Sequence, residues 1–265
     1  MSTRPRPLRL LHLLLGSFLG APLLALPARA ADPFEIQVYD GTANAPGAFG
    51  LELHLNHVPS GLKTAEPPLL APHGQTHFTL EPSFGVTPYW ELGAYLQSAL
   101  RSDGTFDFSG FKLRSKFVTP PGWHPHLRLG FNLEVSRLPE RYDPGQWGGE
   151  LRPIVAWEDE RLLLVCNPIL GLSFKGEAPA LEPAAMVKVK LFGDRLAAGL
   201  EYYSELGRLD GLSPFREQQH YIYEAVDVLG LGRLELNLGV GQGLTRGSNP
   251  FTVKVIVGWS FEKEK

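Results

Sequence analysis

The sequence has little that would hold a small secreted domain together covalently. Cysteine occurs once, as Cys166, so no intramolecular disulfide can form. Beyond residue 30 there is no run of 18 apolar residues, which excludes a transmembrane helix there. No Pro- or Ser-rich linker divides the 265 residues, which indicates one large domain. Turn formers and aromatics are plentiful instead, with 29 glycines, 23 prolines and 15 phenylalanines.

A basic and then apolar N-terminus precedes this domain. Arginines stand at positions 4, 6 and 9, a largely apolar stretch covers 10–26, and Ala28-Arg29-Ala30 forms a small-residue cleavage site. This three-part pattern predicts a cleaved secretory signal peptide over residues 1–30. The alternative is an uncleaved membrane anchor, which the glycines and prolines within the apolar stretch disfavour.

Positive charge is scarce in the mature chain. Removing residues 1–30 takes away four arginines and no acid, so Lys+Arg falls from 25 to 21 against 28 Asp+Glu, a net charge of −7. Nucleic acid is therefore not expected as a partner, because its phosphates attract basic surfaces.

After residue 48 the chain repeats one pattern, in which stretches of about ten residues alternate apolar and polar between turn residues. The last of them, "FTVKVIVGWSF" at 251–261, places Val253, Val255 and Val257 on one face and Lys254 on the other. We expect twelve strands, at residues 49–58, 76–86, 89–100, 107–118, 126–138, 147–158, 161–174, 181–192, 195–206, 218–228, 232–244 and 251–261. The facing of 161–174 and 218–228 is ambiguous, because they alternate poorly.

The connections between these stretches alternate in length. Turns such as 87–88, 159–160 and 193–194 are tight, as are 119–125 and 229–231, whereas 59–75, 101–106, 139–146, 175–180, 207–217 and 245–250 tend to be longer. Short turns on one side and longer loops on the other are typical of a bacterial outer-membrane β-barrel. An even strand count would place both termini on the periplasmic side, and the last strand would close the barrel against the first.

Soluble all-β folds compete with this interpretation: a sandwich, a lipocalin-like barrel or a propeller. Glycines on the polar face, such as Gly130 and Gly239, suit a crowded lumen better than a solvated surface. Aromatic residues near the predicted strand ends, among them Trp90, Trp157 and Trp259, fit the belts at a membrane interface. We therefore expect an all-β, up-and-down transmembrane barrel of about 12 strands over residues 49–265.

The face opposite the apolar one is rich in charge. The lumen-facing candidates are Glu91, Lys112, Arg114, Lys116, Arg128, Glu134, Glu150, Arg152, Lys188 and Lys254. Counting across the turns places Glu91 beside Lys116, and Lys112 in the neighbourhood of Asn132. Such charges either select solutes, where the basic ones form an anion-attracting constriction, or fill and stiffen a narrow lumen. Because acidic and basic residues are interleaved, we favour the interpretation in which they fill and stiffen the lumen.

Residues 31–48 precede the first predicted strand and contain a short alternating piece at 35–40 followed by a Gly/Asn/Pro turn. They form either a plug inside the lumen or a periplasmic lead, and we favour partial insertion.

Evidence for a metal or catalytic site is weak. His73 and His77, or His124 and His126, have ligand-like spacing, but no third ligand is evident, so we expect no metal and no cofactor. Barrel lipases carry His-x-Ser on a strand, and this motif does not occur here. We expect no enzymatic activity; a lipid-modifying enzyme is the weakest alternative.

Several segments carry a family resemblance: "DPFEIQVYDGTANAPGAFGLELHLNHV", "FTLEPSFGVTPYWELGAYLQSAL", "FKLRSKFV", "LRLGFNLEVSRL" and "GGELRPIVAW". Over most of the mature chain the sequence resembles proteobacterial outer-membrane β-barrels near the family of transporters for phenol meta-pathway degradation. The resemblance implies an outer-membrane barrel that moves small, aromatic solutes. The family has no sharp catalytic motif, so no site residue follows from it.

These observations predict a channel or transporter in the bacterial outer membrane, secreted with a cleaved signal peptide, that passes a small aromatic or anionic solute through a narrow charged lumen. Its expected partners are outer-membrane lipid and lipopolysaccharide, the outer-membrane assembly machinery and a small solute. The alternative is a structural or envelope-maintenance barrel with a closed lumen.

Overall fold

A computed structural model describes residues 32–192 and 195–261. The predicted signal peptide over 1–30, the predicted turn at 193–194 and residues 262–265 lie outside the described residues. Among the described residues no helix is long and apolar enough to cross a lipid bilayer.

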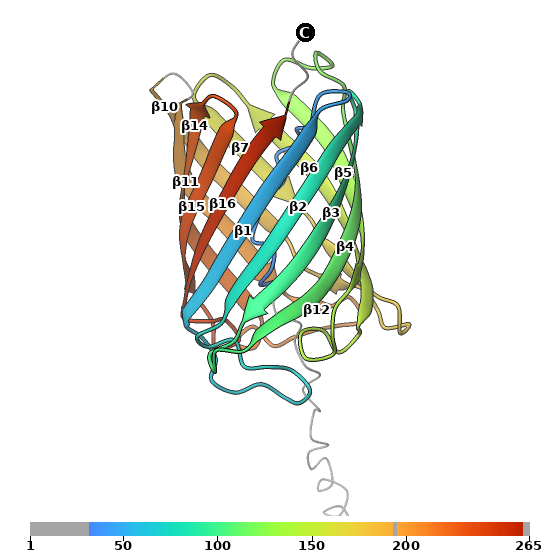
Figure 1. Ribbon diagram of the computed structural model, residues 1–265, viewed down its shortest axis with the longest axis vertical. Helices are drawn as coiled ribbons and strands as arrows, with labels where there is room; N and C mark the ends of the chain where they lie inside the picture. Colours follow the sequence, from blue (N-terminus) through green and yellow to red (C-terminus); the bar gives the residue numbers. More distant parts are fainter. Residues whose placement is uncertain (1–31, 193–194, 262–265) are drawn as a thin grey trace, which may run out of the picture.

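Antiparallel β-strands form almost all of the regular structure (Figure 1). The strands are β1 (Phe49–Ser60), β2 (Thr76–Thr87), β3 (Trp90–Leu100), β4 (Phe106–Val118), β5 (Leu127–Arg137), β6 (Trp147–Glu158), β7 (Leu162–Asn167), β8 (Leu170–Ser173), β9 (Ala180–Leu181), β10 (Ala184–Leu191), β11 (Leu196–Glu205), β12 (Gly207–Arg208), β13 (Gly211–Leu212), β14 (Gln219–Leu231), β15 (Leu234–Gly243) and β16 (Phe251–Phe261).

The strands close into a barrel of 12 crossings, which confirms the predicted fold. β16 pairs with β1 as predicted, from Phe49 opposite Phe261 to His57 opposite Val253, and β6 pairs with β7 to complete the ring. β7 and β8 together form one crossing, and β9 and β10 another. The predicted strands at 161–174 and 181–192 are thus interrupted, at Pro168 and Pro183, because proline cannot donate a ladder hydrogen bond. The β12–β13 pair lies in what the sequence predicted as a loop.

Alternation along each strand separates an apolar exterior from a polar interior. On β10, Met186 and Lys188 are buried while Val187 and Val189 are 41% and 46% exposed. The same holds on β16, where Lys254 is buried between outward valines. An apolar outer surface with a charged interior is the reverse of a soluble barrel.

The two ends of the barrel differ. Tight connections such as 88–89, 159–161 and 232–233 define a short-turn end, and the connections 61–75, 101–105, 138–146, 174–179, 206–218 and 244–250 define a long-loop end. At the short-turn end the Asp159 carboxylate accepts hydrogen bonds of 2.7 Å from the backbone amides of Arg161 and Leu162. These bonds close the turn and lower the pKa of Asp159, because they favour its ionised form.

One register prediction is correct and one is wrong. Glu91 lies opposite Lys116, as counted. Lys112, however, lies opposite Ser136, and Asn132 lies opposite Lys116. The paired part of β4 ends at Val118 and that of β5 begins at Gly130, although β5 itself starts three residues earlier and pairs there with β6. The stagger that a closed barrel imposes on neighbouring strands therefore shifts the pairing by four residues.

Residues 32–48, which we call the inner segment, run through the barrel. Figure 1 shows this blue segment inside the ring, ending where β1 begins at the short-turn end. Phe34 is fully buried against Ala99 and Leu138 near the long loops, and Asp40 contacts Arg128 near the short turns. Asp32 and Phe261, the first and last described residues, lie in opposite halves of the barrel, whereas we expected both termini on one side. A segment held in the lumen crosses the barrel without adding a strand.

Candidate functional site

The inner segment has no neighbouring strand over most of its length, so its backbone carbonyls need other partners. Side chains of the barrel supply them. Six carbonyls each accept a bond from one side chain: Pro33 from Asn56 (2.9 Å), Phe34 from Thr79 (2.8 Å), Ile36 from Lys254 (2.9 Å), Gln37 from Arg152 (3.1 Å), Tyr39 from Asn167 (3.0 Å) and Asp40 from Arg128 (2.9 Å). The lumen is thus built to hold this piece of backbone.

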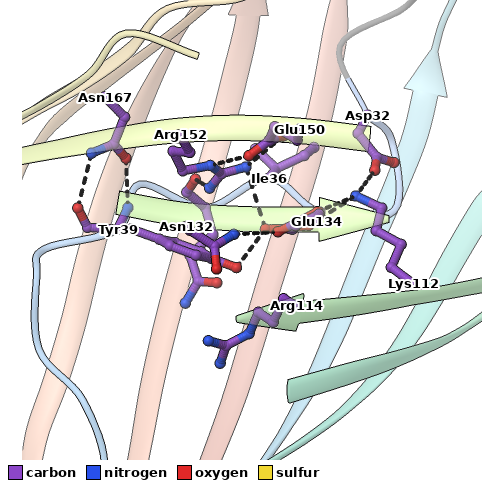
Figure 2. A network of polar contacts seen from close by, with 12 residues as sticks. Asp32, Ile36, Tyr39, Lys112, Arg114, Asn132, Glu134, Glu150, Arg152 and Asn167 are labelled. Atoms are coloured by element: carbon purple, nitrogen blue, oxygen red, sulfur yellow. Dashed lines mark hydrogen bonds and ion pairs between the residues drawn. The ribbon is translucent and has the colours of Figure 1, made fainter. Parts of the chain in front are cut away.

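Asn167 makes the most complete of these contacts. Its Oδ1 accepts from the Tyr39 amide at 2.8 Å while its Nδ2 donates to the Tyr39 carbonyl at 3.0 Å, so one side chain acts like a partner strand (Figure 2). Asn167 ends β7 directly before Pro168, where the ladder is interrupted. The break in the wall coincides with the position that fixes the inner segment.

Glu35 is the centre of a buried charge network. Its carboxylate lies 3.0 Å from Lys112 Nζ and 3.4 Å from an Arg152 guanidinium nitrogen, and it accepts a 2.9 Å bond from the Tyr39 hydroxyl. Lys112 also contacts Asp32 at 2.5 Å and Glu134 at 3.3 Å, as Figure 2 shows. Because Glu35 and Glu134 are buried, removing Lys112 would leave Glu134 without a cation and Glu35 with Arg152 alone.

Tyr39 packs between cations and another tyrosine. Arg152 stacks over its ring at 4.2 Å from the centroid, Arg114 and Lys116 lie at 5.7 and 5.4 Å, and its hydroxyl bonds to that of Tyr95. Cation–π contacts of this kind strengthen where water is excluded. The Tyr39 ring therefore helps to fill the lumen in two ways, by its bulk and by its attraction for these cations.

A second group of ion pairs lies closer to the short-turn end on β1–β4. Arg114 contacts Glu81 and Glu91, each at 2.7 Å, and Lys116 contacts Glu91 at 2.9 Å. His54 contacts Glu81 at 3.0 Å. Glu52, His54 and Glu81 are a metal-ligand-like group among the described residues, but Arg114 already holds Glu81, and ion pairing explains the arrangement.

A third group lies on β10, β11, β14 and β16. Glu201 contacts Lys188 at 2.8 Å and Lys254 at 2.5 Å, and Lys188 also contacts Asp227 at 2.7 Å. Of the remaining candidates, Glu150 binds Arg152 at 2.6 Å, and Arg128 contacts Glu158 and Asp40. All ten sequence-predicted residues lie in these networks, and each has at least one ion-pair partner.

Sequence reasoning missed the residues that hold the inner segment. Glu35, Tyr39, Asn56, Thr79 and Asn167 were not candidates, although Asn167-Pro168 in a poorly alternating strand was a signal of an interrupted ladder. A lone carbonyl-binding asparagine has no motif, so only the three-dimensional arrangement shows it.

Opposite β2–β6, the strands of the third ion-pair group also carry an aromatic and apolar cluster. Tyr203, Tyr221 and Tyr223, on β11 and β14, pack with Ala184 and Ile169 in a buried cluster that also includes Val38 of the inner segment. We call these three tyrosines and their apolar neighbours the tyrosine wall, and β2–β6 with their ion pairs the charged wall.

Cavities remain on both sides of the inner segment. The loop-side cavity, of about 720 Å³ and open at its mouth, lies between residues 32–37 and the tyrosine wall. The turn-side cavity, of about 1180 Å³, lies between residues 37–42 and the strand ends near the short turns. Gln37 lines both, so the segment around it separates two chambers.

Known proteins share the fold but little sequence. No protein-family model matches the chain, and no curated protein matches it significantly. Its structure is similar to that of the COG4313 outer membrane channel from Pseudomonas putida F1, with a TM-score of 0.55 and 12% identity over 86% of this chain and 100% of that one. The chain shares an outer-membrane barrel fold. The resemblance to phenol meta-pathway transporters stays a prediction.

Two further structures are more distant. The KdgM porin in complex with disordered oligogalacturonate has a TM-score of 0.48 and 8% identity over 82% of this chain and 99% of that one. LpxR from Salmonella typhimurium has a TM-score of 0.43 and 9% identity over 79% of this chain and 99% of that one.

Proposed function

We propose that the protein is an outer-membrane channel for a small solute and that the inner segment is its gate. The observation that carries the proposal is the pair of chambers divided by a segment whose carbonyls are held by side chains. Such bonds can be exchanged for water one by one, whereas the strand ladder stays intact. The gate can therefore move without unfolding the barrel.

The membrane location rests on the barrel's outer surface. Its exterior carries large exposed apolar side chains, including Phe108 (59%) and Leu113 (58%), and lipid is the medium in which such a surface is stable. The short-turn end then faces the periplasm and the long-loop end the exterior. With the predicted cleavage after Ala30, the mature chain begins one residue before Asp32, and Asp32 lies in the outward half of the lumen.

An anionic solute finds less support in the geometry than an uncharged or cationic one. Lys112, Arg114 and Arg128, which we expected to attract anions, each contact two or more carboxylates. Their charge serves the ion-pair networks around the inner segment. Aromatic character, which the family resemblance implies, agrees with the tyrosine wall.

Deletion of residues 32–46 tests the gate. In planar bilayers we expect the wild type to conduct weakly and the deletion variant to show conductance several-fold higher, because the two chambers then join. The control removes residues 63–66 of the exposed loop 61–75, which should leave conductance unchanged. Equal conductance in the wild type and the deletion variant would contradict the gate.

A closed structural barrel is the second candidate, favoured by the number of bonds that fix the inner segment. Liposome swelling with uncharged sugars, amino acids and aromatic acids separates the two. Passage of any of these solutes through the wild type supports a channel. Passage through the deletion variant alone supports a barrel whose lumen stays closed.

A further inference from the structure

The loop-side cavity has a chemical character that the rest of the lumen lacks. It lies between the inner segment on one side and β11 and β14 on the other, in the half that we assign to the cell exterior. A solute arriving from outside meets it before the gate.

Three tyrosines line this cavity with their rings. The ring centroids of Tyr203 and Tyr223 are 5.3 Å apart, and those of Tyr221 and Tyr223 are 6.3 Å apart. Their hydroxyls are engaged by Glu201, Gln219 and Thr252 respectively. What the tyrosines offer a ligand is therefore aromatic surface rather than free hydroxyl groups.

The charge of the lining is negative. Asp32, Glu35, Glu150 and Glu182 line the cavity, against one guanidinium, that of Arg152, and the imidazole of His57. Lys112 pairs with Asp32 and Glu35 from the adjoining space and Arg152 with Glu35 and Glu150, so these three carboxylates share two strong bases. The field inside the cavity attracts cations and repels anions.

Asn56 adds a buried acceptor without a partner in the described part of the chain. Its side chain lines the cavity and is 2% exposed, and its Nδ2 donates to the Pro33 carbonyl at 2.9 Å. Its Oδ1 has no hydrogen-bond partner among the described residues. A buried acceptor without a donor is costly, so a ligand that brings an N–H group into this cavity satisfies it.

The protein already places an ammonium group on these rings. Lys254 Nζ lies 5.5 Å from the ring centroid of Tyr203 and 5.7 Å from that of Tyr223. Tyrosine faces attract cations through the quadrupole of the ring. The tyrosine wall therefore suits both an aromatic ring and a positive charge.

We propose that the loop-side cavity is a binding site for a small protonated aromatic amine. The aromatic ring packs on Tyr221 and Tyr223, and the ammonium group donates to Asn56 Oδ1 and is attracted by the carboxylates at the rim, Glu182 among them. The role of this cavity as an entry site for the transported solute rests on the proposed channel function. The binding site itself is inferred from the cavity alone.

Calorimetric titration of the full mature chain in detergent micelles tests the site, with benzylamine, benzyl alcohol and benzoate as probes. We expect benzylamine to bind most tightly, benzyl alcohol more weakly because it lacks the charge, and benzoate not measurably. Equal binding of benzylamine and benzyl alcohol, or tighter binding of benzoate, would overturn the proposal.

Matched variants locate the binding. Glu182→Gln and Asn56→Leu should each weaken benzylamine binding about tenfold, the value of one charge-assisted hydrogen bond. Glu177→Gln makes the same charge change on the exposed loop outside the cavity and should leave binding unchanged. Unchanged affinity in both cavity variants would overturn the site.

The outcome is separable from that of the channel test. Conductance or solute passage without benzylamine binding contradicts the proposed binding site but agrees with the proposed channel function. Benzylamine binding by a protein that passes no solute contradicts the channel and leaves the site standing.

Discussion

The charged wall and the tyrosine wall hold the same inner segment by different forces. The charged wall binds Glu35 and Tyr39 through directional contacts, with Lys112, Arg152 and Tyr95. The tyrosine wall meets Ile36 and Val38 mainly through apolar packing. Directional ion pairs fix a position, whereas apolar contacts tolerate sliding and leave space. The loop-side cavity borders the tyrosine wall for this reason, and a solute path along that wall breaks the fewest strong contacts.

Replacing the lysine at the centre of the charged wall should have the largest effect. Lys112→Met leaves Asp32 and Glu134 without their cation and leaves Glu35 with Arg152 alone, and it should destabilise the protein by about 3–5 kcal/mol. The measurement is the denaturant midpoint of the refolded protein in detergent. Lys63→Met, in the exposed loop 61–75, is the control and should be neutral. A Lys112→Met variant as stable as the control would show that the network does not hold the segment.

The strands and the inward charges of the charged wall follow from the sequence because each obeys a period of two. β4 from Phe111 onward and β5 alternate regularly, which predicts Lys112, Arg114 and Glu134 on the inward face. The partner that those charges bind was not predictable, since Glu35 lies outside any repeating pattern. Nor was the pairing of Lys112 with Ser136, which depends on the stagger of the closed barrel. The tyrosine wall was missed because "QHYIYEAVDVLGL" alternates poorly, with apolar and polar residues on both faces.

A release of the inner segment from the tyrosine side should have a smaller effect. Asn167→Ala removes both bonds to the Tyr39 backbone and should cost about 2 kcal/mol, at about 1 kcal/mol for each hydrogen bond. Because the charged wall still holds Glu35, we expect the barrel to fold and the bilayer current to flicker more often between levels. Thr64→Ala, in the exposed part of the loop 61–75, is the control. If Asn167→Ala leaves the current as quiet as the control does, the backbone clamp is not part of the gate.

The smallest expected effect is a difference between two single-atom deletions, one on each wall. Tyr95→Phe removes a hydroxyl that bonds to Tyr39 and lies 3.5 Å from both Glu35 and Glu134, so it weakens contacts to charged groups. Tyr223→Phe removes a neutral bond to Thr252 and keeps the ring. Bonds to charged groups contribute about 1.5–3 kcal/mol and neutral ones about 1, so Tyr95→Phe should cost about 1 kcal/mol more. The same denaturant series measures both. If the two substitutions lower the free energy of unfolding equally, the charged wall is stabilised by packing. The two walls then differ in shape rather than in charge.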